Sequence, residues 1–261
     1  MYRTAAVRRA GLEAFVTCLS LFGLYTRCST NLHSIQVLRV FIGYDGREVV
    51  AFHALVESIL EHATVPVAVV PLRLSMLGQA FQRERSALQS TEFAFSRFLT
   101  PFLSHYEGWS LFLDCDMIVR RDIAELWALR DDRYAVQVVK HVHRPLEDKK
   151  FLGQVQTRYD KKNWSSVMLF NNARCRRLTP AYVNEASGLE LHQFKWLATE
   201  DDIGELPPRW NFLVGYDAPC EDIALLHYTS GGPYFRAFRE VQYADEWCHY
   251  HARVNFADDD S

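Results

Sequence analysis

The chain has 261 residues, which is enough for one large α/β domain or two small ones. Hydrophobic residues make up 49%, charged residues make up 23%, and the formal net charge is −3. This balance is typical of a globular protein and excludes a strong positive field that would attract nucleic acid or an anionic membrane. The six cysteines form no CxxC pair and match no zinc-module spacing, so we expect reduced thiols in a cytosolic protein.

Residues 1–36 are expected to form a weakly ordered or peripheral extension. Arg3, Arg8 and Arg9 precede the apolar stretch 14–26, an arrangement that resembles a weak signal peptide. The stretch is shorter than the roughly 20 residues that a membrane-spanning helix needs. Three interpretations stay open: a start that is not native, an amphipathic surface helix, or a poor signal sequence.

A strand, a helix and a second strand form the first clear unit. Residues 37–44, VLRVFIGY, are rich in β-branched and aromatic side chains, which predicts a buried strand. Asp45 is placed as a helix N-cap with Glu48 three residues on, close to a capping box. Apolar residues then recur at helical spacing over 49–60, and residues 65–72 predict the second strand. This βαβ unit predicts a parallel sheet, and the turn after its first strand is a natural nucleotide site.

The later elements alternate in the same way. In chain order, the sequence predicts a helix broken near Pro101 (91–106), a strand (109–119), a short helix (123–129), two strands (133–142 and 165–172), a helix capped by Thr179 (178–186), a helix (191–206), extended chain (206–217) and a last strand (223–232). The loop 141–163 carries several lysines that could meet an anionic acceptor or a membrane surface.

Asp114 and Asp116 interrupt the apolar run LFLDCDMIV. Side chains alternate along a strand, so the two carboxylates share one face, and at the carboxyl end of a strand they open toward the ligand crevice of α/β sheets. Two carboxylates at this spacing repel each other unless a cation lies between them, and a hard ion such as Mg²⁺ or Mn²⁺ suits oxygen ligands. Two other interpretations stay open: an exposed acidic turn, and the aspartate pair of haloacid-dehalogenase phosphatases, with 200–202 as later acids.

Five motifs in sequence order resemble glycosyltransferase family eight. They are VFIGYD (40–45), the block 91–127 with Arg97 and the D-x-D, NWSSVMLFN (163–171), EDDIGELPPRWN (200–211) and HYTSGGPYF (227–235). Together they span about residues 38–236, so the chain looks like a bacterial relative of that family. The last motif departs from the family pattern because it lacks a diphosphate-binding lysine and has Tyr234 in place of a tryptophan.

The resemblance implies a fold and an activity. The fold would be a single GT-A (Rossmann-like) α/β domain over 37–261, with a mixed, mostly parallel central sheet flanked by helices. The activity would be metal-dependent transfer of a sugar from a nucleotide-diphosphate sugar, chiefly a UDP-sugar, to an unknown saccharide or other hydroxyl acceptor, with retention. Nucleic acid is not an expected partner, and we expect a cytoplasmic protein, with peripheral contact at the inner membrane left open. A non-catalytic carbohydrate-binding protein is a further alternative.

The resemblance also assigns residues. Asp114, Asp116 and His227 would hold Mn²⁺ or Mg²⁺ and should therefore lie within one coordination sphere of each other. Arg97, Asp201 and Asp202 would be catalytic, the two aspartates on the acceptor side. The donor would be bound by the following residues: Tyr44, Asp45, Arg97, Asp114, Asn163, Ser165, Gly231 and Gly232. The two glycines would offer backbone N–H groups to phosphate, and Trp210 and Asn211 would either contact a sugar or pack a loop.

Overall fold

The computed structural model describes residues 36–85, 89–142 and 161–255. The expected extension 1–36 lies outside the described residues apart from Gln36, as does most of the loop 141–163. Within that loop, Lys161 pairs with Glu200 at 2.6 Å, and Lys162 is buried.

A mixed sheet forms the centre of the described chain, with six strands in the order β2-β1-β3-β6-β5-β7. The strands are β1 (Leu38–Gly43), β2 (Val67–Leu72), β3 (Trp109–Leu113), β5 (Val136–Val138), β6 (Val167–Asn171) and β7 (Ile203–Glu205). β6 runs antiparallel to both of its neighbours, whereas the other pairings are parallel. The mixed, mostly parallel sheet expected from the sequence is confirmed, as is the parallel β1–α2–β2 unit.

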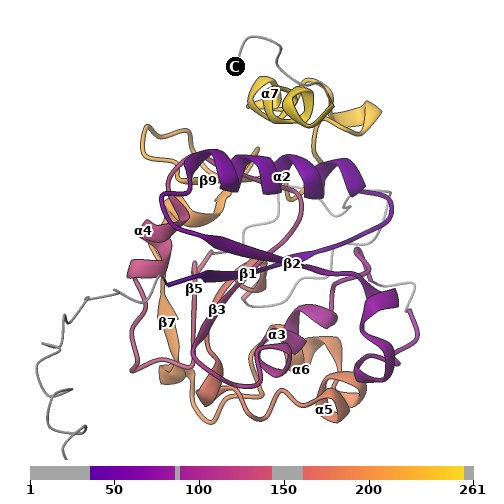
Figure 1. Cartoon of the computed structure of the whole chain (residues 1–261), viewed down its shortest axis with the longest axis vertical. Coiled ribbons are helices and arrows are strands. Elements are labelled where there is room, and N and C mark those ends of the chain that lie inside the picture. Colours follow the sequence, from indigo (N-terminus) through magenta and orange to yellow (C-terminus); the bar gives the residue numbers. More distant parts are fainter. Residues whose placement is uncertain (1–35, 86–88, 143–160, 256–261) are drawn as a thin grey trace, which may run out of the picture. The chain divides into compact units, whose positions relative to one another are not determined.

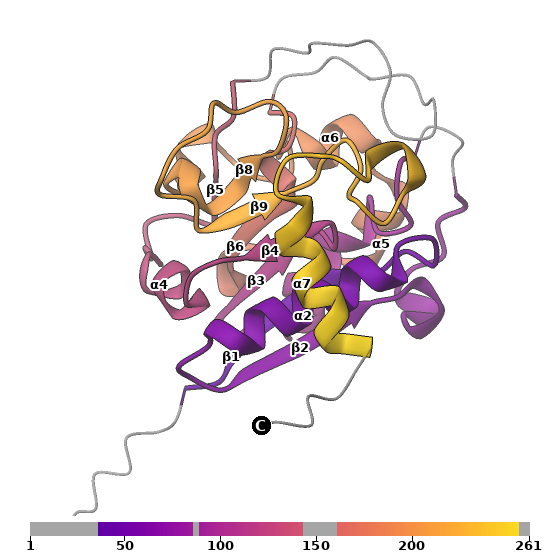
Figure 2. The ribbon, with the colours of Figure 1, turned by 90° about the horizontal axis from the view of Figure 1, so that it is seen from above.

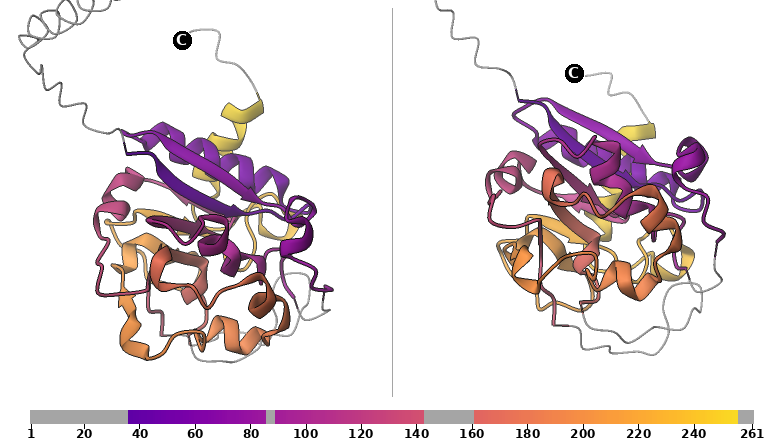
Figure 3. Two further views of the ribbon diagram at one scale, coloured as in Figure 1. Left: turned by 60° about the horizontal axis from the view of Figure 1, so that its bottom comes forward. Right: turned by 90° about the horizontal axis from the view of Figure 1, so that it is seen from below.

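Helices cover both faces of this sheet (Figure 1). On one face lie α2 (Val49–His62) and, above it, α7 (Ala244–Asn255), and the view from above shows α7 crossing α2 (Figure 2). On the other face lie α3 (Thr100–Leu103), α5 (Pro180–Glu185) and α6 (Gly188–His192), seen from below in Figure 3. α4 (Ile123–Ala128) follows the strand β4, and its N-cap Asp122 accepts a hydrogen bond from the amide of Ala124.

A second, small sheet joins β4 (Met117–Val119), β9 (Leu225–His227) and β8 (Phe212–Leu213), and it was not expected from the sequence. A separate apolar cluster packs between this sheet, α2 and α7, with Ile118, Leu226 and Trp247 among its members. None of the described helices combines the length and the apolar character that crossing a membrane requires.

The single strand predicted over 109–119 is wrong, because the chain changes sheets at the two aspartates. The amide of Asp114 still bonds the carbonyl of Ser166 beside β6, whereas the carbonyl of Asp116 already accepts from Tyr228 beside β9. The chain therefore leaves the large sheet after Asp114 and joins the small sheet at Asp116.

Two helix predictions are also wrong. Pro101 lies in the first turn of α3, where its missing N–H costs nothing, so it begins a helix there. The helix predicted over 191–206 ends at His192, and Phe194 has a φ of 59°, a left-handed conformation that stops a helix. The chain then returns as strand β7. Thr179 caps α5 as predicted.

Candidate metal and donor site

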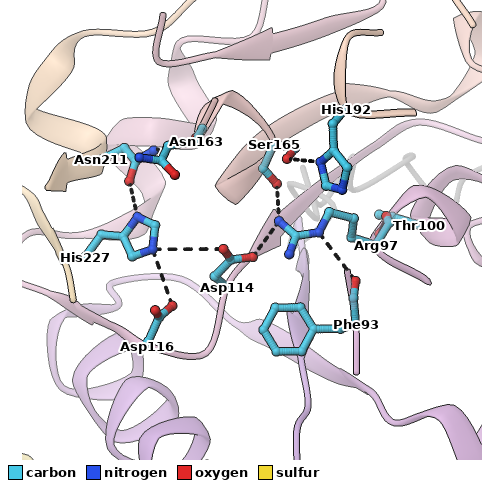
Figure 4. Close-up of polar contacts among 10 residues, drawn as sticks. All are labelled: Phe93, Arg97, Thr100, Asp114, Asp116, Asn163, Ser165, His192, Asn211 and His227. Carbon is cyan, nitrogen blue, oxygen red and sulfur yellow. Dashed lines mark hydrogen bonds and ion pairs between the residues drawn. The ribbon is translucent and has the colours of Figure 1, made fainter. Parts of the chain in front are cut away.

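Two carboxylates and one imidazole meet at the carboxyl edge of β3. Asp114 follows β3, Asp116 precedes β4, and His227 ends β9 directly across from Met117. His227 Nε2 lies 3.4 Å from Asp116 Oδ1 and 3.9 Å from Asp114 Oδ2. One candidate ligand atom from each of the three residues lies within 4.8 Å of the others (Figure 4). The structure thus brings the three residues together, and two carboxylates with an imidazole suit Mn²⁺ or Mg²⁺.

Arg97 is the buried cation beside this cluster. Its Nη1 lies 2.8 Å from Asp114 Oδ1 and donates to the carbonyl of Ser165 at 2.9 Å. Its guanidinium lies 5.2 Å and 5.0 Å from the ring centroids of Phe93 and Phe112. Burial still raises the pKa of Asp114 above its ordinary value, although the charge of Arg97 lowers it. Protein charges therefore compensate only part of the cost of ionising Asp114.

The turn that leads into β6 lies on the other side of Arg97. Ser165 is buried, and its Oγ lies 2.8 Å from Nδ1 of His192, the last residue of α6 (Figure 4). The neighbouring carbonyl of Ser166 accepts from the amide of Asp114 at 3.0 Å. Ser165 thus lies next to Arg97, and its role in donor binding stays a prediction. His192 was missed, because its sequence context suggested only one position in a long helix.

Trp210 and Asn211 were expected either to contact a sugar or to pack a loop, and in the structure they pack inside the protein. Both are fully buried. Asn211 Oδ1 lies 2.9 Å from His227 Nδ1, and Asn211 Nδ2 donates to the carbonyl of Asn163 at 3.2 Å. Asn211 therefore contacts the candidate metal ligand His227 at Nδ1, whereas Nε2 is the ring nitrogen near the two carboxylates.

The carboxylate of Asp45 organises the turn after β1. It accepts hydrogen bonds from Arg47 Nε at 2.9 Å and from the amide of Glu92 at 3.0 Å. Burial raises its pKa, but the hydrogen bonds from Arg47 and Glu92 outweigh burial and hold the pKa below its ordinary value. The N-cap prediction for Asp45 is wrong, because Glu48 occupies that position of α2. Tyr44, the residue before it, is half-buried.

Glu48 is a further buried carboxyl in this region, and the sequence suggested for it only a capping role. It is 4% exposed and accepts a hydrogen bond from the Tyr234 hydroxyl at 2.8 Å. Burial, with the charge of Asp116 second, raises the pKa of Glu48 to about 8. The closing glycine motif is thereby tied to the start of α2.

The glycine turn packs closely within the closing motif. Gly231 has a φ of 130°, and its amide already donates to the carbonyl of Tyr228 at 2.7 Å. A Cβ on Gly232 would lie 2.3 Å from the ring of Tyr234. These glycines allow tight packing of the closing motif, and phosphate binding by the Gly231 and Gly232 N–H groups stays a prediction.

Asp201 and Asp202 lie away from the cluster. The carbonyl of Asp202 accepts from Ala135 at the start of β5, and its carboxylate lies 2.7 Å from Arg174. Since β3 and β5 both run antiparallel to β6, the start of β5 is at the opposite edge of the sheet from Asp114. The structure does not bring the two aspartates to the site, and they take no part in the function proposed below.

Comparison with known proteins identifies the family. No protein-family model matches the chain. Protein CDI of Arabidopsis thaliana is 42% identical over 229 residues, which cover 84% of this chain and 88% of CDI. The chain belongs to the CDI family. The name CDI states no activity, so the family assignment does not identify a reaction, and the chemistry has to be inferred from the residues of the site.

Solved structures identify the fold. The glycosyltransferase GlyE of Streptococcus pneumoniae TIGR4 aligns with a TM-score of 0.56 at 17% identity, over 83% of this chain. The chain spans only 60% of the length of GlyE. The galactosyltransferase LgtC aligns with a TM-score of 0.54 at 14% identity, over 85% of this chain and 98% of LgtC. At these identities the likeness establishes the fold, and the expected GT-A architecture is confirmed for this member of the CDI family.

Proposed function

We propose that this chain is a metal-dependent glycosyltransferase that transfers a sugar from a UDP-sugar to a hydroxyl acceptor, with retention, and that residues 37–261 form its catalytic domain. The observation that carries the proposal is the Asp114–Asp116–His227 cluster at the carboxyl edge of the sheet in a glycosyltransferase fold. The motif resemblance to glycosyltransferase family eight supports the UDP-sugar donor and the retention.

The residues of the cluster fit a divalent cation, and Asp114, Asp116 and His227 would hold it. When bound, such an ion supplies positive charge that stabilises the departing diphosphate. Arg97 holds the carboxylate of Asp114 in place, since its Nη1 contacts both that carboxylate and the carbonyl of Ser165. We therefore propose a positioning role for Arg97.

A phosphatase that uses Asp114 as a nucleophile is disfavoured by the same contacts. Such a carboxylate must reach a phosphorus atom, whereas Asp114 is 8% exposed and paired with Arg97. The fold likeness to the glycosyltransferases GlyE and LgtC is a second argument against the phosphatase.

Calorimetric titration of UDP with and without Mn²⁺ tests the proposal. We expect binding that requires Mn²⁺ and that is lost in Asp116→Asn, which removes one ligand charge at constant volume. Asp222→Asn is the matched control, because Asp222 is exposed and pairs with Arg209, away from the cluster. Hydrolysis of a panel of UDP-sugars should follow the same pattern.

Four results would contradict the proposal. Equal UDP affinity with and without Mn²⁺ would contradict the metal dependence. Full turnover by Asp116→Asn would contradict the role of the D-x-D aspartates. Release of phosphate from a phosphomonoester, unaffected by UDP, would favour the phosphatase. Binding of saccharides without any turnover of a UDP-sugar would indicate a carbohydrate-binding protein.

A further inference from the structure

A chain of hydrogen bonds behind the cluster runs from the backbone of Asn163 through Asn211 to His227 (Figure 4). Asn211 and His227 are 0% and 1% exposed, so water does not compete for these contacts. The Asn163 carbonyl has a fixed acceptor character, and through Asn211 it favours one tautomer of the neutral imidazole ring.

The first link orients the amide of Asn211. A backbone carbonyl can only accept, so the Asn211 atom that lies 3.2 Å from the carbonyl of Asn163 must be the donor Nδ2. The amide oxygen of Asn211 then faces the ring of His227, at 2.9 Å from Nδ1.

The second link orients the proton of His227. The amide oxygen of Asn211 can only accept, so Nδ1 must carry the hydrogen. In a neutral imidazole the other nitrogen, Nε2, then has a free lone pair. Nε2 is the atom that lies 3.4 Å from Asp116 Oδ1 and 3.9 Å from Asp114 Oδ2.

We propose that Asn211 is a positioning residue that holds His227 in the Nδ1–H tautomer, so that Nε2 can act as a ligand to a divalent cation. The cation comes from the proposed function, whereas the tautomer follows from the contacts alone. A lone pair and two carboxylates that face one another repel until a positive charge lies between them, and this arrangement is what a cation site requires.

The segment that begins at Asn163 contacts both sides of the cluster. Asn163 has a φ of 64°, a left-handed conformation that asparagine tolerates better than most residues. Two residues later, the carbonyl of Ser165 accepts a hydrogen bond from Arg97. The next carbonyl, of Ser166, accepts one from the amide of Asp114. One short segment thus aligns Asp114 directly and His227 through Asn211.

The tautomer is measured by long-range ¹⁵N–¹H NMR of the ring of His227 in the metal-free protein, at a pH at which the NMR signals show a neutral ring. We expect a protonated Nδ1 and an unprotonated Nε2, and the reverse assignment would overturn the proposal. Asn211→Leu removes both hydrogen bonds and should abolish the preference. Asn211→Asp keeps an acceptor for Nδ1–H and should retain the wild-type tautomer.

Mn²⁺ affinity, measured by calorimetry, is the second readout. Loss of a partner behind a ligand typically weakens metal binding by about 10-fold to 100-fold, and we expect this in Asn211→Leu and wild-type-like binding in Asn211→Asp. Asn172→Leu is the matched control. Asn172 is also fully buried with two side-chain hydrogen bonds, to Ser110 and Glu107, but lies at the opposite edge of the sheet.

The outcomes separate this inference from the proposed function. If the wild-type protein binds no Mn²⁺, the metal-dependent function fails, and the wild-type tautomer still decides the role of Asn211. Unchanged tautomer and Mn²⁺ affinity in Asn211→Leu would overturn the inference while the function stands. If Asn211→Leu does not fold, the wild-type tautomer and Asn211→Asp decide it.

Discussion

At the scale of single residues, the site gathers acidic groups at the edge of an apolar core. Glu48 is one of these groups, and both its own burial and the charge of Asp116 raise its pKa by disfavouring the ionised form. Its hydrogen bond from Tyr234 fixes its position without removing that cost. Glu48 therefore makes the stability of the metal-free protein depend on pH.

Stability should fall as pH rises through the range that Glu48 titrates. Its pKa is about 8 in the folded protein and 4.5 for an ordinary glutamate, so between these values the folded chain binds more protons than the unfolded chain. The free energy of unfolding then decreases with pH, by on the order of a few kcal/mol across the window.

Urea unfolding of the metal-free protein across this pH range measures the effect. Glu48→Gln cannot ionise and should lose most of the decrease, whereas Glu205→Gln on the exposed side of β7 should keep it. A wild-type decrease that survives unchanged in Glu48→Gln would assign the pH dependence to other groups.

At the scale of elements, the end of β1 sets the position of the segment that carries Arg97. Gly43 ends β1, and a Cβ there would lie 2.3 Å from the ring of Phe93. Phe93 in turn accepts a hydrogen bond from Arg97 Nε through its carbonyl, at 3.4 Å. The close approach at Gly43 thus allows the Phe93 ring to lie over the sheet edge beside the site.

Gly43→Ala should therefore displace Phe93 and destabilise the protein by about 1–3 kcal/mol, the usual cost of overpacking a core. Gly46→Ala, three residues later, is the matched control, because its Cβ would meet only Glu92 Oε1, at 3.9 Å. Chemical unfolding of both variants checks this prediction. Similar losses in the two would show that general glycine effects, and not contact with Phe93, are responsible.

At the scale of the whole described fold, the candidate ligands come from distant parts of the sequence. Asp116 and His227 are 111 positions apart along the chain, yet Asp116 directly precedes β4 and His227 ends the adjacent strand β9. An ion that binds this arrangement binds the folded chain and not the unfolded one, because unfolding separates the ligands.

Mn²⁺ should accordingly raise the melting temperature. At a free concentration of about 100 times its Kd, a ligand specific to the folded state adds about 2.7 kcal/mol to the free energy of unfolding. Differential scanning calorimetry with a Mn²⁺ series should show this rise, and Asp116→Asn should lose it. A rise of equal size in that variant would place the ion elsewhere.

The sequence predicted what depends on local pattern and on the order of motifs. The parallel β1–α2–β2 unit and the N-cap at Thr179 follow from hydrophobic spacing and helix-capping chemistry. The proximity of Asp114 and His227 came from motif resemblance.

What the sequence could not predict depends on contacts between distant segments. The chain leaves one sheet and joins another at Asp116 because Tyr228, far along the chain, supplies the next hydrogen bond. Asp202 resembled a site acid by its neighbours, and only the pairing of β5 with β6 shows that it lies at the other edge. The role of Asn211 is visible only once His227 is in place.

The change of sheet between Asp114 and Asp116 has a mechanical consequence. Asp114 is held by the ladder of β3 and β6, whereas His227 is held by the ladder of β4 and β9, and no strand pairing joins the two sheets in the described part of the chain. A cation shared by these ligands is a cross-link between two separately hydrogen-bonded sheets. The affinity for the cation then depends on how precisely the two sheets are positioned relative to each other. A substitution in the apolar cluster under α7 would therefore weaken metal binding without contacting a ligand.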